Sequence, residues 1–203
     1  MIIGISGKIG SGKGAVAEKL AEIFHSKNPV YYKIFAHPLK DIVAILTKYP
    51  LNTDKDNFFT DGIRDYSQED KNKFIPMYNM TIGEMTQKIG TEAMRNNFDP
   101  DVWTKAIFID YDDEKNYIWI IPDCRFPNEI DAIKSRGGII IRVNGDPAKV
   151  NSNTKRDKTH ISETALDNYK EFDYIIENNS TLEDLYAKIE EIANSIIKKN
   201  NNN

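Results

Sequence analysis

A chain of 203 residues is long enough to bury the core of one medium-sized domain. Its net charge of −4, from 27 basic and 31 acidic side chains, provides no basic excess for a nucleic-acid backbone, so a nucleic-acid polymer is not an expected partner. Its single cysteine excludes an internal disulfide and fits a reducing compartment. No stretch reaches membrane-spanning length and residues 1–6 are too short for a signal peptide, so we expect a cytoplasmic protein with no membrane partner.

The chain begins with the pattern of a strand, a glycine-rich loop and a helix. The apolar run IIGI at residues 2–5 is followed by GKIGSGKG at residues 7–14 and then by apolar residues at helical spacing, including Val16 and Leu20. The spacing G-x-x-x-x-G-K between a strand and a helix is typical of a phosphate-binding loop. Glycines let backbone N–H groups converge on an anion, towards which the new helix directs its positive end. The alternative is a glycine-rich turn that binds nothing.

The loop therefore predicts a ligand with a polyphosphate. Lys13 is the expected cation for the β- and γ-phosphates. The hydroxyl residue that usually follows this lysine and helps to hold Mg²⁺ is absent, because Gly14 and Ala15 occupy those positions. Ser11 and Asp123 are consequently the candidate metal ligands. The predicted cofactor-binding residues are Lys8, Ile9, Gly10, Ser11, Gly12, Lys13, Gly14 and Ala15.

Strands and helices alternate along the rest of the chain, which predicts a parallel sheet with helices on its faces. Pro122 should mark a strand end, because proline cannot donate to a central ladder. The expected elements are, in chain order, a strand at 30–36, helices at 38–48, from 81 towards 95 and from 99 through 107, a strand at 117–121, a helix from about 128 to 137, strands at 139–143 and 174–177, and a last helix after Ser180.

Capping boxes and long polar segments complete this outline. Thr81 with Glu84, and Ser180 with Glu183, have capping-box spacing. Residues 49–80 form a polar insertion that could shape an acceptor pocket or a subunit contact, and residues 144–165 form a polar, basic segment that is either a solvated loop or a lid over transferring phosphates. Residues 198–203 are expected to be a disordered tail. Without any repeat or dividing linker, residues 1–203 should form one domain, and a homodimer remains an open option.

Ligands of open parallel sheets bind beyond the carboxyl ends of the strands, which directs attention to the residues found there. His37 and Lys40 follow the second strand, and Asp123 and Arg125 follow the third. Asp123 could orient Mg²⁺ or cap a helix. The planar fork of Arg125 matches phosphate oxygens, although a salt bridge to Glu129 is the alternative.

A third group of candidates lies between residues 87 and 103. Gln87, Thr91 and Arg95 recur at i, i+4 and i+8, so they should share one helix face suited to a base and a phosphate, or one that is merely solvated. Trp103 could stack on a base or belong to the core. The expected substrate-binding residues are His37, Lys40, Gln87, Thr91, Arg95, Trp103, Arg125, Asn128 and Glu129.

Six sequence blocks occur in order: GKIGSGKG, FAHPLKD, QKIGTEAMRNNFDPDVW, DCRFPNEIDAI, HISETALD and FDYIIENNSTLEDL. Together they resemble the phage-type deoxynucleoside monophosphate kinases over nearly the full chain. The family more often has an aspartate at the position of His37 and a hydroxyl residue at that of Ala15. The resemblance implies a P-loop kinase fold, a three-layer α/β/α arrangement with a parallel five-stranded sheet, and it implies ATP as the donor, a deoxynucleoside monophosphate as the acceptor and a phage origin.

These observations favour a phosphotransferase that converts ATP and a deoxynucleoside monophosphate into ADP and the diphosphate. Lys13, Arg125 and Arg156 are the expected catalytic residues, acting on the donor, on the acceptor phosphate and, from the lid, on the transferring group. One alternative is another small-molecule P-loop kinase, for example one acting on dephospho-coenzyme A, in which Asp123 would be the base. Another is a nucleotide-binding switch without transfer activity, which Ala15 would favour. The bases accepted and the preference for deoxyribose are not encoded in any recognisable pattern.

Overall fold

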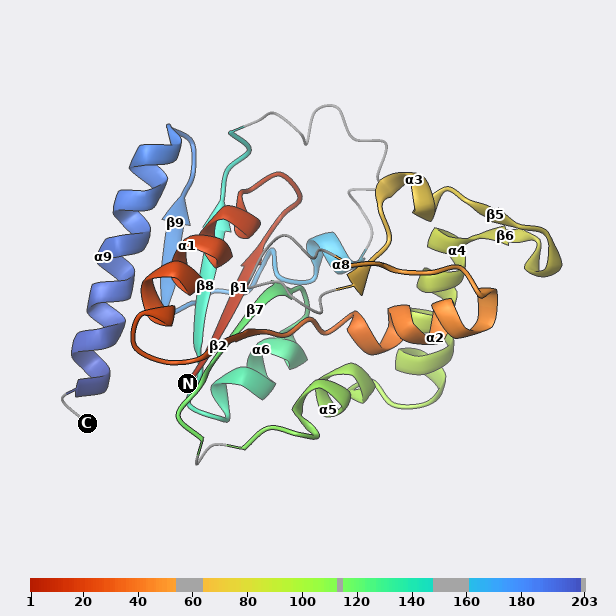
Figure 1. Cartoon of the computed structure of the whole chain (residues 1–203), viewed down its shortest axis with the longest axis horizontal. Helices are drawn as coiled ribbons and strands as arrows, with labels where there is room; N and C mark the ends of the chain where they lie inside the picture. The colour runs from red at the N-terminus through yellow and green to blue at the C-terminus, as the bar shows by residue number, and fades with distance from the viewer. Residues whose placement is uncertain (54–63, 113–114, 148–160, 202–203) are drawn as a thin grey trace. The chain divides into compact units, whose positions relative to one another are not determined.

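The computed structural model describes residues 1–53, 64–112, 115–147 and 161–201 (Figure 1). They form two compact units. The first, here called the sheet unit, comprises residues 1–32 and 113–203, and the second, the inserted unit, comprises residues 33–112. The inserted unit therefore starts well before, and ends well after, the insertion expected at 49–80. Most of the expected lid, including Arg156, lies outside the described residues.

A five-stranded parallel sheet with the order β2-β7-β1-β8-β9 is the centre of the sheet unit. Strand β1 is the middle one, and its residues 2–6 are all buried. The strands are β1 (Ile2–Gly7), β2 (Val30–Tyr32), β7 (Ile118–Cys124), β8 (Ile139–Asn144) and β9 (Tyr174–Glu177). The helices are α1 (Lys13–His25), α6 (Pro127–Lys134), α8 (Ile161–Thr164) and α9 (Leu182–Asn201).

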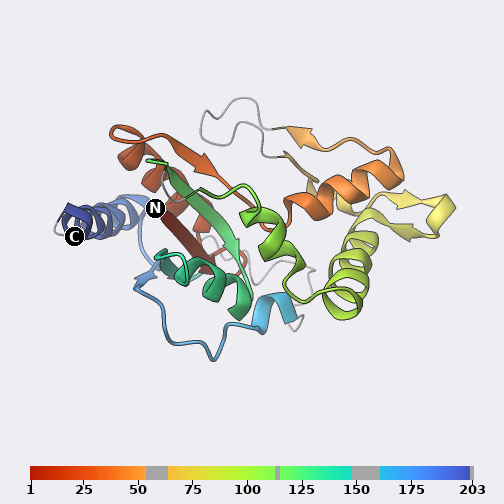
Figure 2. The same ribbon diagram turned by 90° about the horizontal axis from the view of Figure 1, so that it is seen from below.

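Helices cover both faces of this sheet, as the three-layer expectation requires (Figure 2). Helices α1 and α9 pack against each other on one face, and α6 packs on β1 and β8 from the other. Fully buried isoleucines from the strands and from α6 fill the space between the layers, among them Ile3, Ile120, Ile133 and Ile140. Burial of each such side chain contributes about 1.5–3 kcal/mol to stability. No helix in the described part of the chain is long and apolar enough to cross a bilayer.

The ends of two strands differ from the prediction by more than one residue. Strand β2 ends at Tyr32, because it pairs with β7 over three residues only, and the chain turns before α2. Strand β7 continues past Pro122 to Cys124. The proline is tolerated because the register between β1 and β7 shifts between the pairs Gly4–Ile121 and Ser6–Cys124, so no ladder hydrogen bond is required of its nitrogen.

The last helix also differs at both ends. Its capping residue is Thr181, whose hydroxyl accepts a hydrogen bond from the Asp184 amide at 3.3 Å, so the cap lies one residue after the expected Ser180. Ser180 instead donates to the Asp184 carboxylate. At the other end α9 continues to Asn201, which corrects the expected disordered tail up to that residue.

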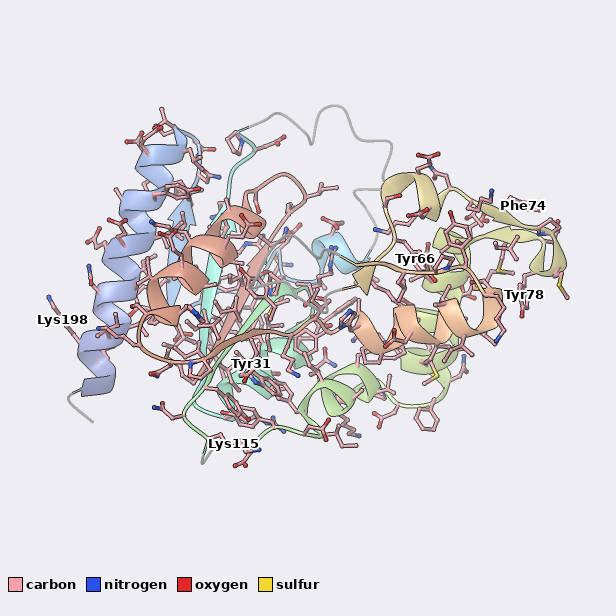
Figure 3. All side chains as sticks on the ribbon, in the orientation of Figure 1. Tyr31, Tyr66, Phe74, Tyr78, Lys115 and Lys198 are labelled. Atoms are coloured by element: carbon pink, nitrogen blue, oxygen red, sulfur yellow. The ribbon has the colours of Figure 1, made fainter. Side chains whose placement is uncertain are left out.

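The inserted unit consists of short elements around a core of its own. Its helices are α2 (His37–Thr47), α3 (Gln68–Lys71), the 3-10 helix η1 (Pro76–Tyr78), α4 (Ile82–Gln87), the π-helix η2 (Lys88–Arg95) and α5 (Val102–Phe108). Two antiparallel pairs join β3 (Asn52–Thr53) to β4 (Arg64–Asp65) and β5 (Phe74–Ile75) to β6 (Met80–Thr81). The capping box predicted from Thr81 and Glu84 is confirmed at the start of α4. In Figure 3, Phe74 and Tyr78 lie on the β5–β6 hairpin and Tyr66 lies near α2.

The structure corrects the possible base-stacking role of Trp103. Its side chain belongs to the core of the inserted unit, together with Leu39, Val43, Ile82 and Met85, and it is only 3% exposed. Its indole N–H donates a buried hydrogen bond of 3.0 Å to the Gly90 carbonyl, which ties α5 to the π-helix. The indole is therefore a structural residue, and no face of it is open to a base.

We expect Trp103→Phe to lower the free energy of unfolding by about 1–3 kcal/mol, because it leaves the buried Gly90 carbonyl without its donor and removes part of a packed ring. Urea denaturation followed by far-UV circular dichroism measures this. Phe98→Leu is the control at a side chain that is 73% exposed, and it should change stability by less than about 0.5 kcal/mol. Equal stability of Trp103→Phe and wild type would contradict the core role.

Candidate active site

The glycine-rich loop links β1 to α1 at the carboxyl edge of the sheet. Gly12 is the residue before α1, and its φ of 93° lies in the left-handed region that favours glycine. Within the loop the Ser11 amide donates to the Lys8 carbonyl at 3.2 Å, and the Val16 amide donates to the Gly12 carbonyl at 3.1 Å. The strand, loop and helix predicted for a phosphate-binding loop are thus all present, and α1 is long enough to direct a helix dipole at the loop.

Asn178, the residue after β9, holds this loop from the other end of the chain. Its side-chain amide donates a buried hydrogen bond of 2.9 Å to the Ser11 carbonyl, while its own backbone amide donates to Asn144 at 2.8 Å. A Cβ on Gly12 would lie 2.4 Å from the Asn178 amide nitrogen. The loop conformation therefore depends on Gly12 and Asn178 together. Sequence reasoning did not include Asn178 in the site, although its position at a strand's carboxyl end was a signal for it.

Lys13 folds back onto the loop. Its ammonium donates to the carbonyls of Gly7 at 2.7 Å and Lys8 at 2.8 Å. Burial, followed by the positive charges of Arg125 and Arg142, lowers the pKa of Lys13 to about 8, against the opposing influence of nearby carboxylates. A bound anion would reverse this shift, because it would favour the charged ammonium.

Arg125 comes from the turn between β7 and α6. Its backbone amide and that of Phe126 donate to the Glu129 carboxylate at 2.7 and 3.1 Å. Its guanidinium makes a 2.6 Å ion pair with Glu163 of α8. The predicted alternative of a salt bridge to Glu129 is therefore corrected: Glu129 is a buried cap of α6 that fixes the backbone of Arg125. Since its carboxylate already accepts these two amides, we also withdraw Glu129 from the substrate-contacting residues.

Arg142 is a third cation at the site, and it was not predicted. It lies on β8, donates to the Ser6 hydroxyl at 3.0 Å and to the Asn144 side-chain oxygen at 3.1 Å, and is stacked over the Phe172 ring. Burial lowers its pKa. An arginine inside an otherwise apolar strand was the signal that sequence reasoning could have used.

Arg125, Arg142 and Glu163 line a small cavity beside the loop. Its other lining residues are Ser6, Gly7, Lys8, Cys124 and Leu166. The volume of about 10 Å³ is enough for a single water molecule. Cys124 is fully enclosed there, and burial raises the pKa of its thiol, which agrees with a packing role. Lys8, another lining residue, is partly exposed and pairs with Asp167 at 2.9 Å.

The two candidate metal ligands, Ser11 and Asp123, differ in how accessible their oxygen atoms are. The Ser11 hydroxyl is completely enclosed, so as placed it cannot bind a metal ion, which corrects that expectation. Asp123 is half-buried on β7, close enough for its carboxylate to raise the pKa of Lys13. Among the described residues no group of three His, Cys, Asp or Glu side chains could hold a metal. One carboxylate is nevertheless a fitting site for Mg²⁺, which usually takes most of its ligands from phosphates and water.

The remaining predicted acceptor residues belong to the inserted unit, apart from Asn128, which is half-buried near the start of α6. His37 and Lys40 lie in the first turn of α2, and Lys40 is 8% exposed. Gln87 ends α4 and is exposed. Thr91 and Arg95 are half-buried in the π-helix η2. Hydrogen bonds of a π-helix run from i to i+5, so the predicted α-helical face across Gln87, Thr91 and Arg95 is replaced by a wider winding.

We expect Gly12→Ala to lower the free energy of unfolding by about 1–3 kcal/mol, because alanine is strained at this φ and its Cβ would collide with Asn178. Gly14→Ala is the matched control: a Cβ there meets nothing within 4 Å, so stability should change by less than about 1 kcal/mol. Thermal unfolding of both variants tests the difference, and equal melting temperatures would contradict the role of Gly12.

The lowered pKa of Lys13 predicts proton uptake when a polyphosphate binds. At about pH 8.5 the free amine is partly deprotonated, and the anion's negative charge should raise its pKa and protonate it, whereas at about pH 6.5 it already carries its proton. Calorimetry in buffers of different ionisation enthalpy measures this uptake with ATP. Lys13→Arg should abolish it, since arginine stays charged, and uptake of equal size in that variant would assign the proton to another group.

Residues 51–189 of the chain match the family model described as deoxynucleotide monophosphate kinase. The deoxynucleotide monophosphate kinase of Enterobacteria phage T4 is 34% identical over 112 residues, which is 54% of this chain and 44% of that protein. Its counterpart in Escherichia phage RB69 is 32% identical over 116 residues, 55% of this chain and 44% of the relative. The match thus spans less than half the length of each phage protein.

A protein of Acanthamoeba polyphaga mimivirus, provisionally given the same name, is 28% identical over 200 residues, 93% of this chain and 94% of the relative. Among solved structures, the shikimate kinase of Aquifex aeolicus is 15% identical with a TM-score of 0.49 over 96% of both chains, a likeness too distant to carry an argument. The family model, in contrast, covers more than half of the chain. On this ground, the chain belongs to the deoxynucleotide monophosphate kinase family.

Proposed function

We propose that this protein transfers the γ-phosphoryl group of ATP to a deoxynucleoside monophosphate, giving ADP and the diphosphate. The observation that carries the proposal is the arrangement of Lys13 on a phosphate-binding loop with Arg125 from the neighbouring strand, within a chain of this family. The influence of Arg125 on the pKa of Lys13 puts their charges close together, as donor and acceptor phosphates require.

These residues promote phosphoryl transfer by electrostatic stabilisation of the phosphates. An oxygen of the acceptor phosphate is anionic at neutral pH, so it attacks the γ-phosphorus without a general base, and the γ-phosphoryl bond to the β-phosphate oxygen breaks. Lys13 and the loop amides hold the β- and γ-phosphates. Arg125 holds the acceptor phosphate, because its planar fork accommodates two phosphate oxygens. Mg²⁺, when bound, supplies positive charge to the donor phosphates, and Asp123 is the protein group that fits it.

Residues of the inserted unit complete the proposal. We assign recognition of the acceptor nucleotide to His37, Lys40, Gln87, Thr91 and Arg95, with Asn128 from the sheet unit. Arg156 remains the expected cation for the transferring group. The two phage relatives suggest a role in viral deoxynucleotide supply, in the cytoplasm of an infected cell.

The test is ADP formation from Mg-ATP with dTMP, dGMP, dCMP, dAMP, their ribose counterparts and dephospho-coenzyme A. We expect turnover with one or more deoxynucleotides and formation of the matching diphosphate. Turnover of dephospho-coenzyme A alone would move the protein to another kinase class. ATP binding without transfer to any acceptor would identify a nucleotide-binding switch instead.

Two variants assign the roles. Lys13→Ala should lower kcat by about 100-fold or more, because the donor phosphates lose a preorganised cation. Arg125→Ala should raise the KM for the monophosphate by about 10-fold or more with a smaller effect on the KM for ATP. Arg136→Ala, which removes an exposed arginine just beyond the other end of α6, is the matched control and should leave both constants unchanged. A rise confined to the KM for ATP in Arg125→Ala would place Arg125 on the donor side.

A further inference from the structure

A carboxylate lies among the cations of this site. Glu163 is the third residue of α8, its side chain is 11% exposed, and its Oε1 lies 2.6 Å from Nη1 of Arg125. Its charge also acts on Lys13, in the opposite sense to the charges of Arg125 and Arg142. Glu163 is therefore one of the internal anions that balance these cations, beside Asp123, which also raises the pKa of Lys13. The sequence motif of the phosphate-binding loop does not predict a carboxylate at this position.

The cations around Glu163 are not equally free to change partners. Arg142 is held by hydrogen bonds to Ser6 and Asn144 and by the Phe172 ring. Arg125 is held through its backbone, by the Glu129 carboxylate. The side chain of Arg125 is one-third exposed, and within the described part of the chain its ion pair is with Glu163. The guanidinium can thus exchange its anion while the turn that carries it stays in place.

The cavity beside this ion pair is too small for a further anion. The cavity lined by Arg125, Arg142 and Glu163 has a volume of about 10 Å³, which holds one water molecule and no phosphate group. A phosphate placed on Arg125 beside Glu163 would also bring two anions to within a few ångströms of each other in a half-buried site, which is strongly unfavourable. A phosphate that pairs with the part of the Arg125 guanidinium now paired with Glu163 therefore requires the carboxylate to leave.

We propose that Glu163 is a replaceable counterion of Arg125, and that the phosphate of the acceptor nucleotide takes its place. This inference rests on the proposed function, because it takes the ligand of Arg125 to be a monophosphate. In the free protein Glu163 keeps the half-buried guanidinium paired, which avoids the cost of an unpaired buried charge. When the acceptor arrives, its phosphate oxygens pair with Arg125 and the Glu163 carboxylate moves into water, still ionised.

The exchange makes Glu163 a specificity residue for charge. Only an anionic group can displace a carboxylate from a guanidinium without leaving Arg125 unpaired. A nucleoside without a phosphate has no such group, so its binding would leave the ion pair intact and the position of the acceptor phosphate closed. The ion pair consequently selects nucleotides over nucleosides before any base is read.

The direct test is the affinity of the acceptor for Glu163→Gln, which keeps the shape of the side chain and removes its charge. The probe is the monophosphate with the highest turnover, titrated by calorimetry without ATP, with inorganic phosphate as a second probe. Because the phosphate no longer competes with a carboxylate, Glu163→Gln should bind the monophosphate about 3- to 10-fold more tightly than wild type. In turnover assays the variant should lower KM for the monophosphate by a larger factor than it changes kcat.

Two controls separate ion-pair exchange from a general change of charge. Asp167→Asn removes an equal charge from a carboxylate that pairs with Lys8 rather than Arg125, and it should tighten binding by a smaller factor. In an Arg125→Ala background, Glu163→Gln should have no effect on affinity for the monophosphate, because the guanidinium for which the carboxylate and the phosphate compete is absent. Equal tightening by Asp167→Asn, or an undiminished effect of Glu163→Gln without Arg125, would overturn the proposal.

Weaker binding by Glu163→Gln would also overturn it, because Glu163 would then orient Arg125 for the phosphate rather than compete with it. If Glu163→Gln does not fold, two other experiments give the same decision. One uses Glu163→Asp, which retains the charge. The other follows the NMR signal of the Arg125 side-chain N–H in wild type, which should shift on binding of a monophosphate and stay in place with the nucleoside. Wild-type turnover with no tightening in Glu163→Gln refutes the exchange alone. Tightening towards inorganic phosphate with no turnover of any monophosphate refutes the proposed function alone.

Discussion

Repulsion among Lys13, Arg125 and Arg142 is the constraint on which the rest of this site depends. Each of the two arginines lowers the pKa of Lys13, so their charges act on one another even before a ligand is present. The fold offsets this repulsion with local partners: loop carbonyls for Lys13, side-chain oxygens for Arg142 and a carboxylate for Arg125. Under the proposed function, the phosphates of the two nucleotides would replace some of these partners.

The sheet explains how partners so distant in sequence come together. The loop after β1, the turn after β7, the end of β8 and the residue after β9 all lie at the carboxyl edge of parallel strands, in the order that the sheet imposes. Each strand contributes one kind of group there: backbone amides and Lys13, then Arg125, then Arg142, then Asn178. The buried isoleucine ladder holds these groups in place, so the edge can carry a charge density that an isolated loop could not keep ordered.

Local sequence signals predicted the elements of the sheet unit, since apolar runs, glycines and prolines act within a few residues. The strand at 30–36 was too long and Pro122 was placed at an end, because pairing length and the β1–β7 register shift depend on the neighbouring strand. Lys13 and Arg125 were found in the site because each lies next to a recognisable strand end. Glu163 and Arg142 were missed because they contact Arg125 across 38 residues and Ser6 across 136, and no short motif records such contacts. Asn178 follows a predicted strand end, but its bond to Ser11 across 167 residues has no local sequence signature either.

The hydrogen bond from Asn178 to the loop joins two segments that are synthesised at different times. The loop, at residues 7–14, is synthesised well before the amide that fixes its shape, because Asn178 follows Ser11 by 167 residues. A nascent chain therefore carries the complete nucleotide-binding motif long before the motif can hold its binding geometry. Under the proposed function, nucleotide affinity therefore depends on the complete five-stranded sheet, and it should arise when β9 joins β8 rather than when the motif is translated.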